Sequence, residues 1–138
     1  MNLEVVAICD AATDCAGKLN ILGAFDTIFA EEIPFKYQHM ALALRIRFTR
    51  IEEGEHKVKI NFVDADGKSV IPGLDGKINI RFGHDAQTAV GNMIINLNNV
   101  EFKDEGEYSV DVAINGAQVH SMPLFVRMKP QKNANNLN

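Results

Sequence analysis

The chain of 138 residues is long enough for one domain that buries roughly two-thirds of the surface of its unfolded form. Its 14 basic and 18 acidic residues give a formal net charge of −4, and no segment gathers the basic residues, which argues against nucleic acid or an anionic membrane as the main partner. No apolar run approaches the ~18 residues of a membrane span, and the first residues lack the basic region of a signal peptide, so we expect a cytoplasmic protein.

The first part of the chain has the pattern of a β-hairpin. Leu3–Cys9 is apolar and β-branched, Lys18–Ala30 is apolar again, and the turn-forming residues of Asp10–Gly17 predict the loop between them. Gly23 interrupts the second strand, which indicates a bulge or a close backbone approach. Because residues 5–8 (VVAI) contain no polar alternate, we expect this hairpin to be buried on both faces or to pack against another subunit.

Three later segments alternate apolar and polar residues with the period of a half-buried strand. Their apolar positions are Leu42, Leu44, Ile46 and Phe48; Val58, Ile60 and Phe62; and Ile78, Ile80 and Phe82. A connection over residues 31–37 precedes the first of them, because Pro34 has no amide hydrogen for a ladder. If the second and third segments pair, their outward residues form a modest basic stripe, which we interpret as protection of a sheet edge. These residues are Lys57, Lys59, Asn61, Lys77, Asn79 and Arg81.

A tight corner follows, in which Asp104, Gly106 and Tyr108 lie directly ahead of an alternating run of residues 108–114. Glycine takes positive φ without steric cost, and the aspartate side chain can bond backbone amides two residues on. The tyrosine can bury its ring while its hydroxyl donates to a backbone carbonyl of the corner. The stretch therefore predicts a turn into a half-buried strand between two sheets.

This corner resembles the E–F corner of the immunoglobulin-like superfamily, with the pattern L-x-x-x-V-x-x-x-D-x-G-x-Y-x-C. Leu97 is one residue too close to Val100 for that spacing, and Ile95 or Asn96 is the alternative match. Val110 stands at the cysteine position and the chain has no Trp, so the hallmarks of antibody domains are missing. The resemblance implies an all-β fold, an antiparallel immunoglobulin-like β-sandwich of about seven to nine strands. Another antiparallel fold with a tight Asp-Gly loop is the alternative.

The last strands and the C-terminus have separate signals. Asn115-Gly116 is a strong hairpin signal, and Val119–Met128 returns as the partner strand. Pro123 lies inside that strand, which predicts a bulge or an exposed edge there. Residues 129–138 are polar and Asn-rich and predict a disordered tail after a single domain of residues 1–128.

Few residues have the pattern of a metal or catalytic site. Asp64-x-Asp66-Gly67 resembles the start of a calcium loop, but Ser69 replaces the invariant Gly and Asp75 the bidentate Glu, which favours a hairpin turn. A weak site using Asp64, Asp66 and Asp75 is the alternative. In the loop Gly83–Gln87, His84 adjoins Asp85, although neighbouring side chains rarely face each other. We expect the other histidines, His39, His56 and His120, to face solvent. We assign no catalytic, cofactor-binding or metal-binding residue.

Cys9 and Cys15 are the only cysteines, and without an export signal we expect both to be free thiols. Cys9 lies in an apolar run and is best interpreted as a small buried residue. The neighbouring charge of Asp10 would make its thiol less reactive. A Cys9–Cys15 bridge across the hairpin is the alternative for an oxidising compartment.

The segments C-D-A-A-x-x-C-A-G-K-L-N-I-L-G, E-E-G-E-H-K-V and V-D-A-D-G together resemble a family of small bacterial hypothetical proteins, over most of residues 3–127. The resemblance implies a fold and a cytoplasmic bacterial setting, and no site residues or cofactor. The function that the sequence favours is a non-catalytic module that binds a protein partner or forms a homo-oligomer. The alternative is a small-ligand-binding or weak metal-binding protein, or an enzyme, that uses the loops Asp64–Asp75 or Gly83–Gln87.

Overall fold

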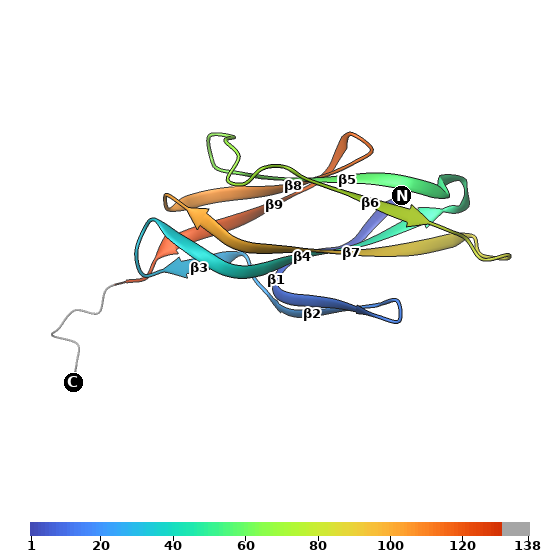
Figure 1. The fold of residues 1–138 in the computed structure, drawn as a ribbon, viewed down its shortest axis with the longest axis horizontal. Helices are drawn as coiled ribbons and strands as arrows, with labels where there is room; N and C mark the ends of the chain where they lie inside the picture. Colours follow the sequence, from blue (N-terminus) through green and yellow to red (C-terminus); the bar gives the residue numbers. More distant parts are fainter. Residues whose placement is uncertain (131–138) are drawn as a thin grey trace.

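The computed structural model describes residues 1–130, which form a sandwich of two β-sheets (Figure 1). The first sheet has the strand order β2-β1-β4-β7, and the second has the order β3-β9-β8-β5-β6. A short 3-10 helix, η1, joins β4 to β5. The elements are β1 Asn2–Cys15, β2 Lys18–Ala24, β3 Thr27–Ala30, β4 Phe35–Thr49, η1 Arg50–Glu52, β5 Gly54–Val63, β6 Leu74–Ile80, β7 Thr88–Phe102, β8 Gly106–Ile114 and β9 Ala117–Met128. The all-β sandwich predicted from the sequence is confirmed.

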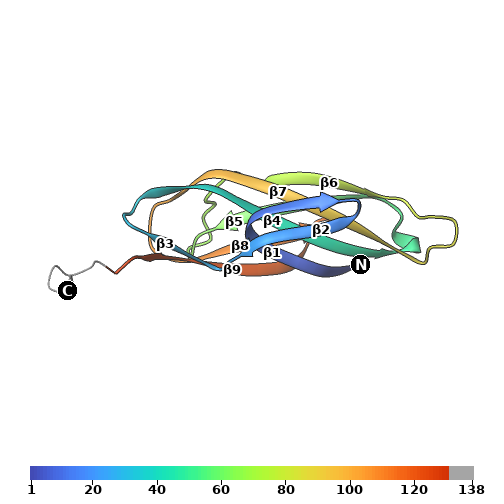
Figure 2. The same ribbon diagram turned by 90° about the horizontal axis from the view of Figure 1, so that it is seen from below.

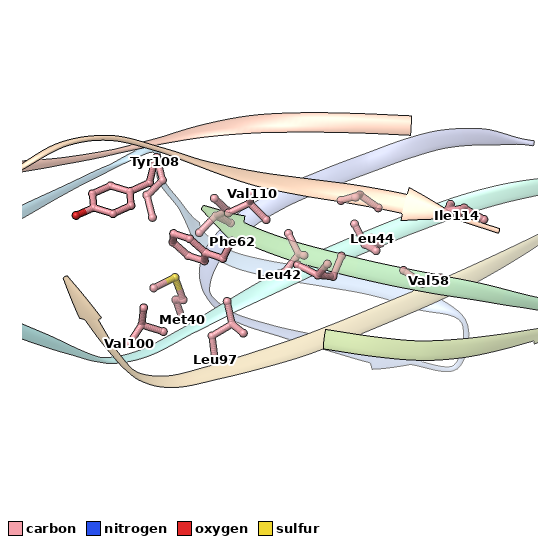
Figure 3. Close-up of a cluster of buried hydrophobic side chains, with 14 of the residues drawn as sticks. Met40, Leu42, Leu44, Val58, Phe62, Leu97, Val100, Tyr108, Val110 and Ile114 are labelled. Carbon is pink, nitrogen blue, oxygen red and sulfur yellow. The ribbon is translucent and has the colours of Figure 1, made fainter. Parts of the chain in front are cut away.

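The core lies between the two sheets, and the period-two patterns place its side chains there (Figure 3). On β4 the alternating positions from Leu42 to Phe48 are buried, and on β5 Val58, Ile60 and Phe62 face them. Successive residues of a strand point to opposite faces, so one alternating segment supplies one layer of the core. No helix long and apolar enough to cross a membrane occurs among residues 1–130.

The N-terminal hairpin differs from its prediction. The loop predicted at Asp10–Gly17 is wrong, because β1 continues to Cys15 and the turn consists of Ala16 and Gly17 alone. Both turn residues have positive φ, 51° and 79°, as two-residue hairpin turns require. The Asp14 carboxylate accepts the Gly17 amide at 2.9 Å, so a residue expected in the loop stabilises the turn from the end of the strand.

The hairpin folds back over the outer face of its own sheet and makes a partial third layer (Figures 1 and 2). At its tip the Gly17 carbonyl accepts hydrogen bonds from Arg45 of β4 and Asn92 of β7, at 3.5 and 3.2 Å. Beneath it lies a small buried cluster that explains why β4 is buried on both faces. The cluster contains Cys9, Ala41 and Ala43, packed against Ala12, Leu19 and Ile94.

The bend of this hairpin depends on Gly23, where the sequence predicts a close backbone approach. Gly23 has φ of 66°, and a Cβ atom built there would lie 2.5 Å from Oδ2 of Asp10. A side chain at position 23 would therefore meet both backbone strain and the Asp10 carboxylate. The predicted close approach is confirmed.

Gly23→Ala should loosen the hairpin and expose Cys9, which is fully buried beneath it. In a Cys15→Ser background, we expect thiol labelling of Cys9 to accelerate about tenfold, because left-handed strain of roughly 1–2 kcal/mol shifts the local opening equilibrium by that order. Gly116→Ala is the matched control, since Gly116 also has positive φ but nothing lies within 4 Å of a Cβ built there. Equal labelling rates in the two variants would show that the bend does not hold the hairpin closed.

One strand pairing is parallel, so the prediction of an antiparallel sandwich is correct except at β3. The segment predicted as one strand over Lys18–Ala30 is divided, because the chain passes from the first sheet to the second at Phe25 and Asp26. The Phe25 amide donates to the Ile8 carbonyl at 2.9 Å, and the Asp26 carbonyl accepts from the Phe125 amide at 2.7 Å. β3 then runs parallel to β9. The predicted tail of residues 129–138 lies outside the described residues from position 131 onward.

The turn after β4 contains Glu52, a carboxylate whose pKa is lowered by its hydrogen bonds. Glu52 Oε1 accepts hydrogen bonds from the amide and the hydroxyl of Thr49, each at 2.9 Å, and lies 2.9 Å from the terminal ammonium of Met1. These hydrogen bonds, first of all that of the Thr49 amide, lower the pKa of Glu52 from 4.5 to about 2.

Because the pKa of Glu52 is lower in the folded state than in the unfolded state, its contribution is complete above about pH 4.5 and disappears as the pH falls toward 2. The difference in unfolding free energy between the wild type and Glu52→Gln should therefore shrink over that window. Urea denaturation at stepped pH measures it. A difference that stays constant from pH 6 to about pH 2 would contradict this assignment.

Candidate interaction surface

The loop that begins at Asp64 and resembles the start of a calcium loop uses its first carboxylate to close a turn. Asp64 Oδ1 accepts the amides of Asp66 and Lys68, both at 2.9 Å, as the hairpin-turn interpretation requires. Asp75 lies on β6 opposite Lys59, which precedes Asp64 by five residues in the chain. The structure does not bring the three aspartates together, and residues 1–130 contain no group of three acidic, His or Cys side chains arranged for a metal ion.

His56 is buried, so the prediction that it faces solvent is wrong. Its Nε2 donates to the Glu52 carbonyl at 2.6 Å, and its Nδ1 accepts from the Asn115 amide nitrogen at 2.9 Å. The ring also stacks on Phe48 with centroids 4.5 Å apart. Position 56 has the same parity as Val58, so extending the alternation by two residues would have placed this side chain inward. His56 is a satisfied core residue.

The other histidines face solvent, as the sequence predicts for His39 and His120. His39 Nδ1 lies 2.8 Å from Asn98 Oδ1 on the neighbouring strand. His84 is also exposed, in the loop Gly83–Gln87, and this loop is held by Arg50, whose Nη1 donates to the carbonyls of Gly83 and Ala86 at 3.1 and 2.8 Å. These contacts orient the loop backbone and form no acid–base pair of side chains.

The predicted basic stripe forms in part. β5 and β6 do pair, and Lys57 lies directly opposite Lys77. Acidic residues interrupt the stripe, however, because Asp75 lies opposite Lys59 and Glu55 lies 3.6 Å from the Lys77 ammonium. The outer face of these strands is therefore a mixed charged surface that protects an edge.

The edge of β2, residues Lys18–Ala24, is the most exposed apolar strand edge in the described part of the chain. β2 ends its sheet and pairs only with β1, so its other side presents backbone groups with no strand partner among residues 1–130. Leu22 is 70% exposed and Ile21 is 38% exposed. The strand has no Pro and one charged residue, Lys18. Unpaired edges without charge or Pro are templates for pairing with another chain.

Two other sheet edges are charged or short, because β6 carries Asp75 and Lys77 and β3 has four residues only. Charges and short strands both discourage the addition of a further strand. β7 also ends its sheet, but its exposed side chains are all polar, so its edge is less apolar than that of β2.

Another candidate surface is a hollow of about 470 Å³ where the edges of β1 and β9 meet. It is lined by Val6, Ile8, Phe25, Met122 and Pro123, among others. The Phe125 amide points to this side, where it bonds the Asp26 carbonyl, and Pro123, two positions earlier, points its hydrogen-free nitrogen the same way. This agrees with the predicted exposed edge at Pro123. Because Pro123 cannot donate a hydrogen bond to a further strand, the β2 edge is the better candidate for an interaction surface.

The cysteines lie on the same strand, six positions apart, which corresponds to roughly 20 Å in an extended chain, so a bridge between them within one molecule is excluded. Both are free thiols, Cys9 buried and Cys15 exposed. Burial, with a smaller effect of the Asp10 charge, raises the pKa of the Cys9 thiol. Cys9 is therefore a packing residue of the cluster under the hairpin.

Comparisons with known proteins place the chain in a family without assigning it an activity. No curated protein matches it. A structurally similar chain is the alkylpurine DNA glycosylase AlkC of Pseudomonas fluorescens, solved bound to DNA containing an abasic site analogue. The likeness has a TM-score of 0.43 and 16% identity over 74% of this chain and 28% of that one, too weak to support a functional argument. A family model matches residues 4–127, which shows that the chain belongs to DUF6941, a family of unknown function.

Proposed function

We propose that this protein is a non-catalytic interaction module that binds another polypeptide through the edge of β2. The observation that supports the proposal is a strand with one unpaired edge that carries a 70% exposed leucine and a single charged residue. An extended segment added to such an edge gains main-chain hydrogen bonds, and the exposed side chains supply apolar contact. The hairpin is anchored at Gly17 by Arg45 and Asn92, so the edge is held in place before a partner arrives.

We also infer an immunoglobulin-like arrangement for the sandwich. One sheet contains β1, β4 and β7, and the other contains β9, β8, β5 and β6, which correspond to strands A, B, E and G, F, C, C′ of variable-type domains. Tyr108, at the start of β8, donates its hydroxyl to the Asp104 carbonyl at 2.6 Å, as expected for a tyrosine corner. Such domains commonly serve binding, although a fold alone is a weak argument for function.

A reducing, cytoplasmic location, in bacteria as the sequence resemblance implies, is part of the proposal. Its support is the pair of free thiols, one of them exposed on a hairpin near the proposed surface. Exposed thiols persist in reducing compartments and tend to oxidise outside them.

The test places a photo-reactive amino acid at position 22 in the native host. We expect irradiation to attach a second polypeptide there. The same amino acid at Asn79, an exposed position on the β6 strand of the other sheet, is the control and should give no adduct. Equal adducts at both positions, or none at position 22, would count against the β2 edge as a binding surface.

A further inference from the structure

We infer that residues 10–23, the part of the N-terminal hairpin that contains its turn, form a hinged flap that opens away from the sandwich while both sheets stay folded. In the structure the flap is closed and lies over the outer face of the first sheet (Figures 1 and 2). Opening of the flap requires no partner, and it is therefore a property of the fold that goes beyond the proposed function.

The hinge of the flap lies at Asp10 and Gly23, where the hairpin leaves its sheet. β1 pairs with β4 only from Asn2 to Cys9, whereas its pairing with β2 continues from Cys9 to Cys15. β2 pairs with no other strand of residues 1–130, so the flap shares no ladder with β4 or β7. Both arms bend where Gly23 lies against Asp10, and a bend confined to one pair of residues lets the arms move together, because few dihedral angles change.

The apolar contact that keeps the flap closed is small. The flap contributes two apolar side chains, Ala12 and Leu19, to the buried cluster beneath it. The side chains across from them belong to the sandwich and are mostly short: Cys9, Ala41, Ala43 and Ile94. Because the free energy of apolar contact grows with the area removed from water, this cluster stabilises the closed flap much less than the main core stabilises the sandwich.

One carbonyl group fastens the tip of the flap. The Gly17 carbonyl accepts hydrogen bonds from Arg45 Nη1 at 3.5 Å and from Asn92 Nδ2 at 3.2 Å. Within residues 1–130, no other side-chain hydrogen bond and no ion pair joins the flap to the sandwich. Opening therefore breaks two hydrogen bonds and a small apolar contact but no ladder, so it requires much less free energy than unfolding of the sandwich.

Opening exposes a surface that the closed flap covers. Cys9, Ala41 and Ala43 are fully buried beneath it, although the two alanines lie on the outer face of β4. Because β2 is one arm of the flap, opening also displaces the β2 edge from the sandwich, and this consequence alone rests on the proposed function. The hairpin is thus a conformational device with a closed state and an open state, and only the open state gives access to the outer face of β4.

Thiol labelling of Cys9 under native conditions tests the flap, with the purified chain in a Cys15→Ser background. Because opening exposes little surface, the labelling rate should be nearly independent of urea at low concentration. It should rise steeply only where global unfolding becomes the faster route to Cys9. A labelling rate that follows the full urea dependence of global unfolding from the lowest concentration would overturn the inference.

The contact at the tip gives a second, more specific test. Asn92→Ala removes a donor to the Gly17 carbonyl and should accelerate labelling of Cys9 about 3–10-fold, the factor that corresponds to the net contribution of one hydrogen bond. Asn98→Ala is the matched control, because Asn98 also lies on β7 but contacts His39, away from the flap, and its loss should leave the rate unchanged.

Equal labelling rates in these two variants would show that the tip contact does not control access to Cys9 and would also overturn the inference. Urea denaturation of both variants checks that a faster rate does not come from lower global stability. A flap that opens as expected while position 22 captures no partner leaves this inference intact and counts only against the proposed function.

Discussion

Phe102→Ala should lower the free energy of unfolding by about 3–5 kcal/mol, the largest effect we expect from a single substitution. Phe102 is fully buried at the end of β7 and packs on aromatic rings from three other strands. Its ring centroid lies 5.5 Å from Phe35, 5.8 Å from Phe62 and 5.1 Å from Tyr108. Removing the ring leaves a cavity between the two sheets, which surrounding rings cannot fill without leaving their own positions. Urea denaturation measures the loss.

Phe29→Ala provides the control for that substitution. Phe29 lies on β3 and is 59% exposed, so truncation should change stability by less than about 0.5 kcal/mol. The two substitutions remove the same atoms and differ in burial. Losses of similar size in both variants would show that Phe102 is not at the centre of the core.

Tyr108→Phe should cost roughly 0.5–1.5 kcal/mol, because the part-buried hydrogen bond from the hydroxyl to the Asp104 carbonyl is lost. The ring itself stays in place, packed edge-on against Phe102, so the substitution removes one hydrogen bond and little packing. The measurement is again urea denaturation, with an unchanged dependence on denaturant concentration.

Tyr37→Phe is the matched control, because the Tyr37 hydroxyl makes no hydrogen bond within residues 1–130, while its ring lies 5.9 Å from Phe25. Burial raises the pKa of both tyrosines, so both substitutions are made in similarly desolvated surroundings. A negligible loss for Tyr108→Phe, or equal losses for the two variants, would mean that the hydroxyl does not stabilise the corner.

Local patterns predicted the elements that depend on local chemistry. The alternation from Leu42 to Phe48 and the run of residues 108–114 became strands, because a half-buried strand needs one apolar face and the sequence supplies it. The corner at Tyr108 was predictable for a similar reason, since Asp104 and Tyr108 lie four residues apart and bond within the turn itself. Asn115-Gly116 likewise formed a two-residue turn with positive φ at both positions.

Features that depend on contacts between distant segments were not predictable. The fold-back of the N-terminal hairpin requires Gly17 to meet Arg45 and Asn92, and nothing in residues 1–30 specifies that contact. The passage of the chain between sheets at Phe25 depends on the positions of β1 and β9 in space. The two-residue turn at Ala16 and Gly17 was not predictable from the sequence, because alanine seldom takes the φ of 51° that Ala16 has here.

The sequence predicted the region of the candidate surface, the N-terminal hairpin, but not which residues of the hairpin are exposed. The sequence indicated association through the apolar N-terminal hairpin and drew attention to Val5, Val6 and Ile8. In the structure β4 and the core cover much of these side chains, so they are half-buried or buried within their own chain. The exposed apolar residues lie on the other arm of the hairpin, at Ile21 and Leu22, because β2 has a neighbour on one side only. Exposure of an edge depends on strand order, which one sequence does not reveal.

Photo-crosslinking from the β2 edge is the most direct measurement of the central claim, that this edge binds another polypeptide. A photo-reactive amino acid at Asn20 should attach a second polypeptide in the native host, and Leu22→Lys should reduce the adduct, because it removes the most exposed apolar side chain of the strand. Asn79→Lys, on β6 of the other sheet, should leave the adduct unchanged. Equal adducts with and without Leu22→Lys would contradict the account.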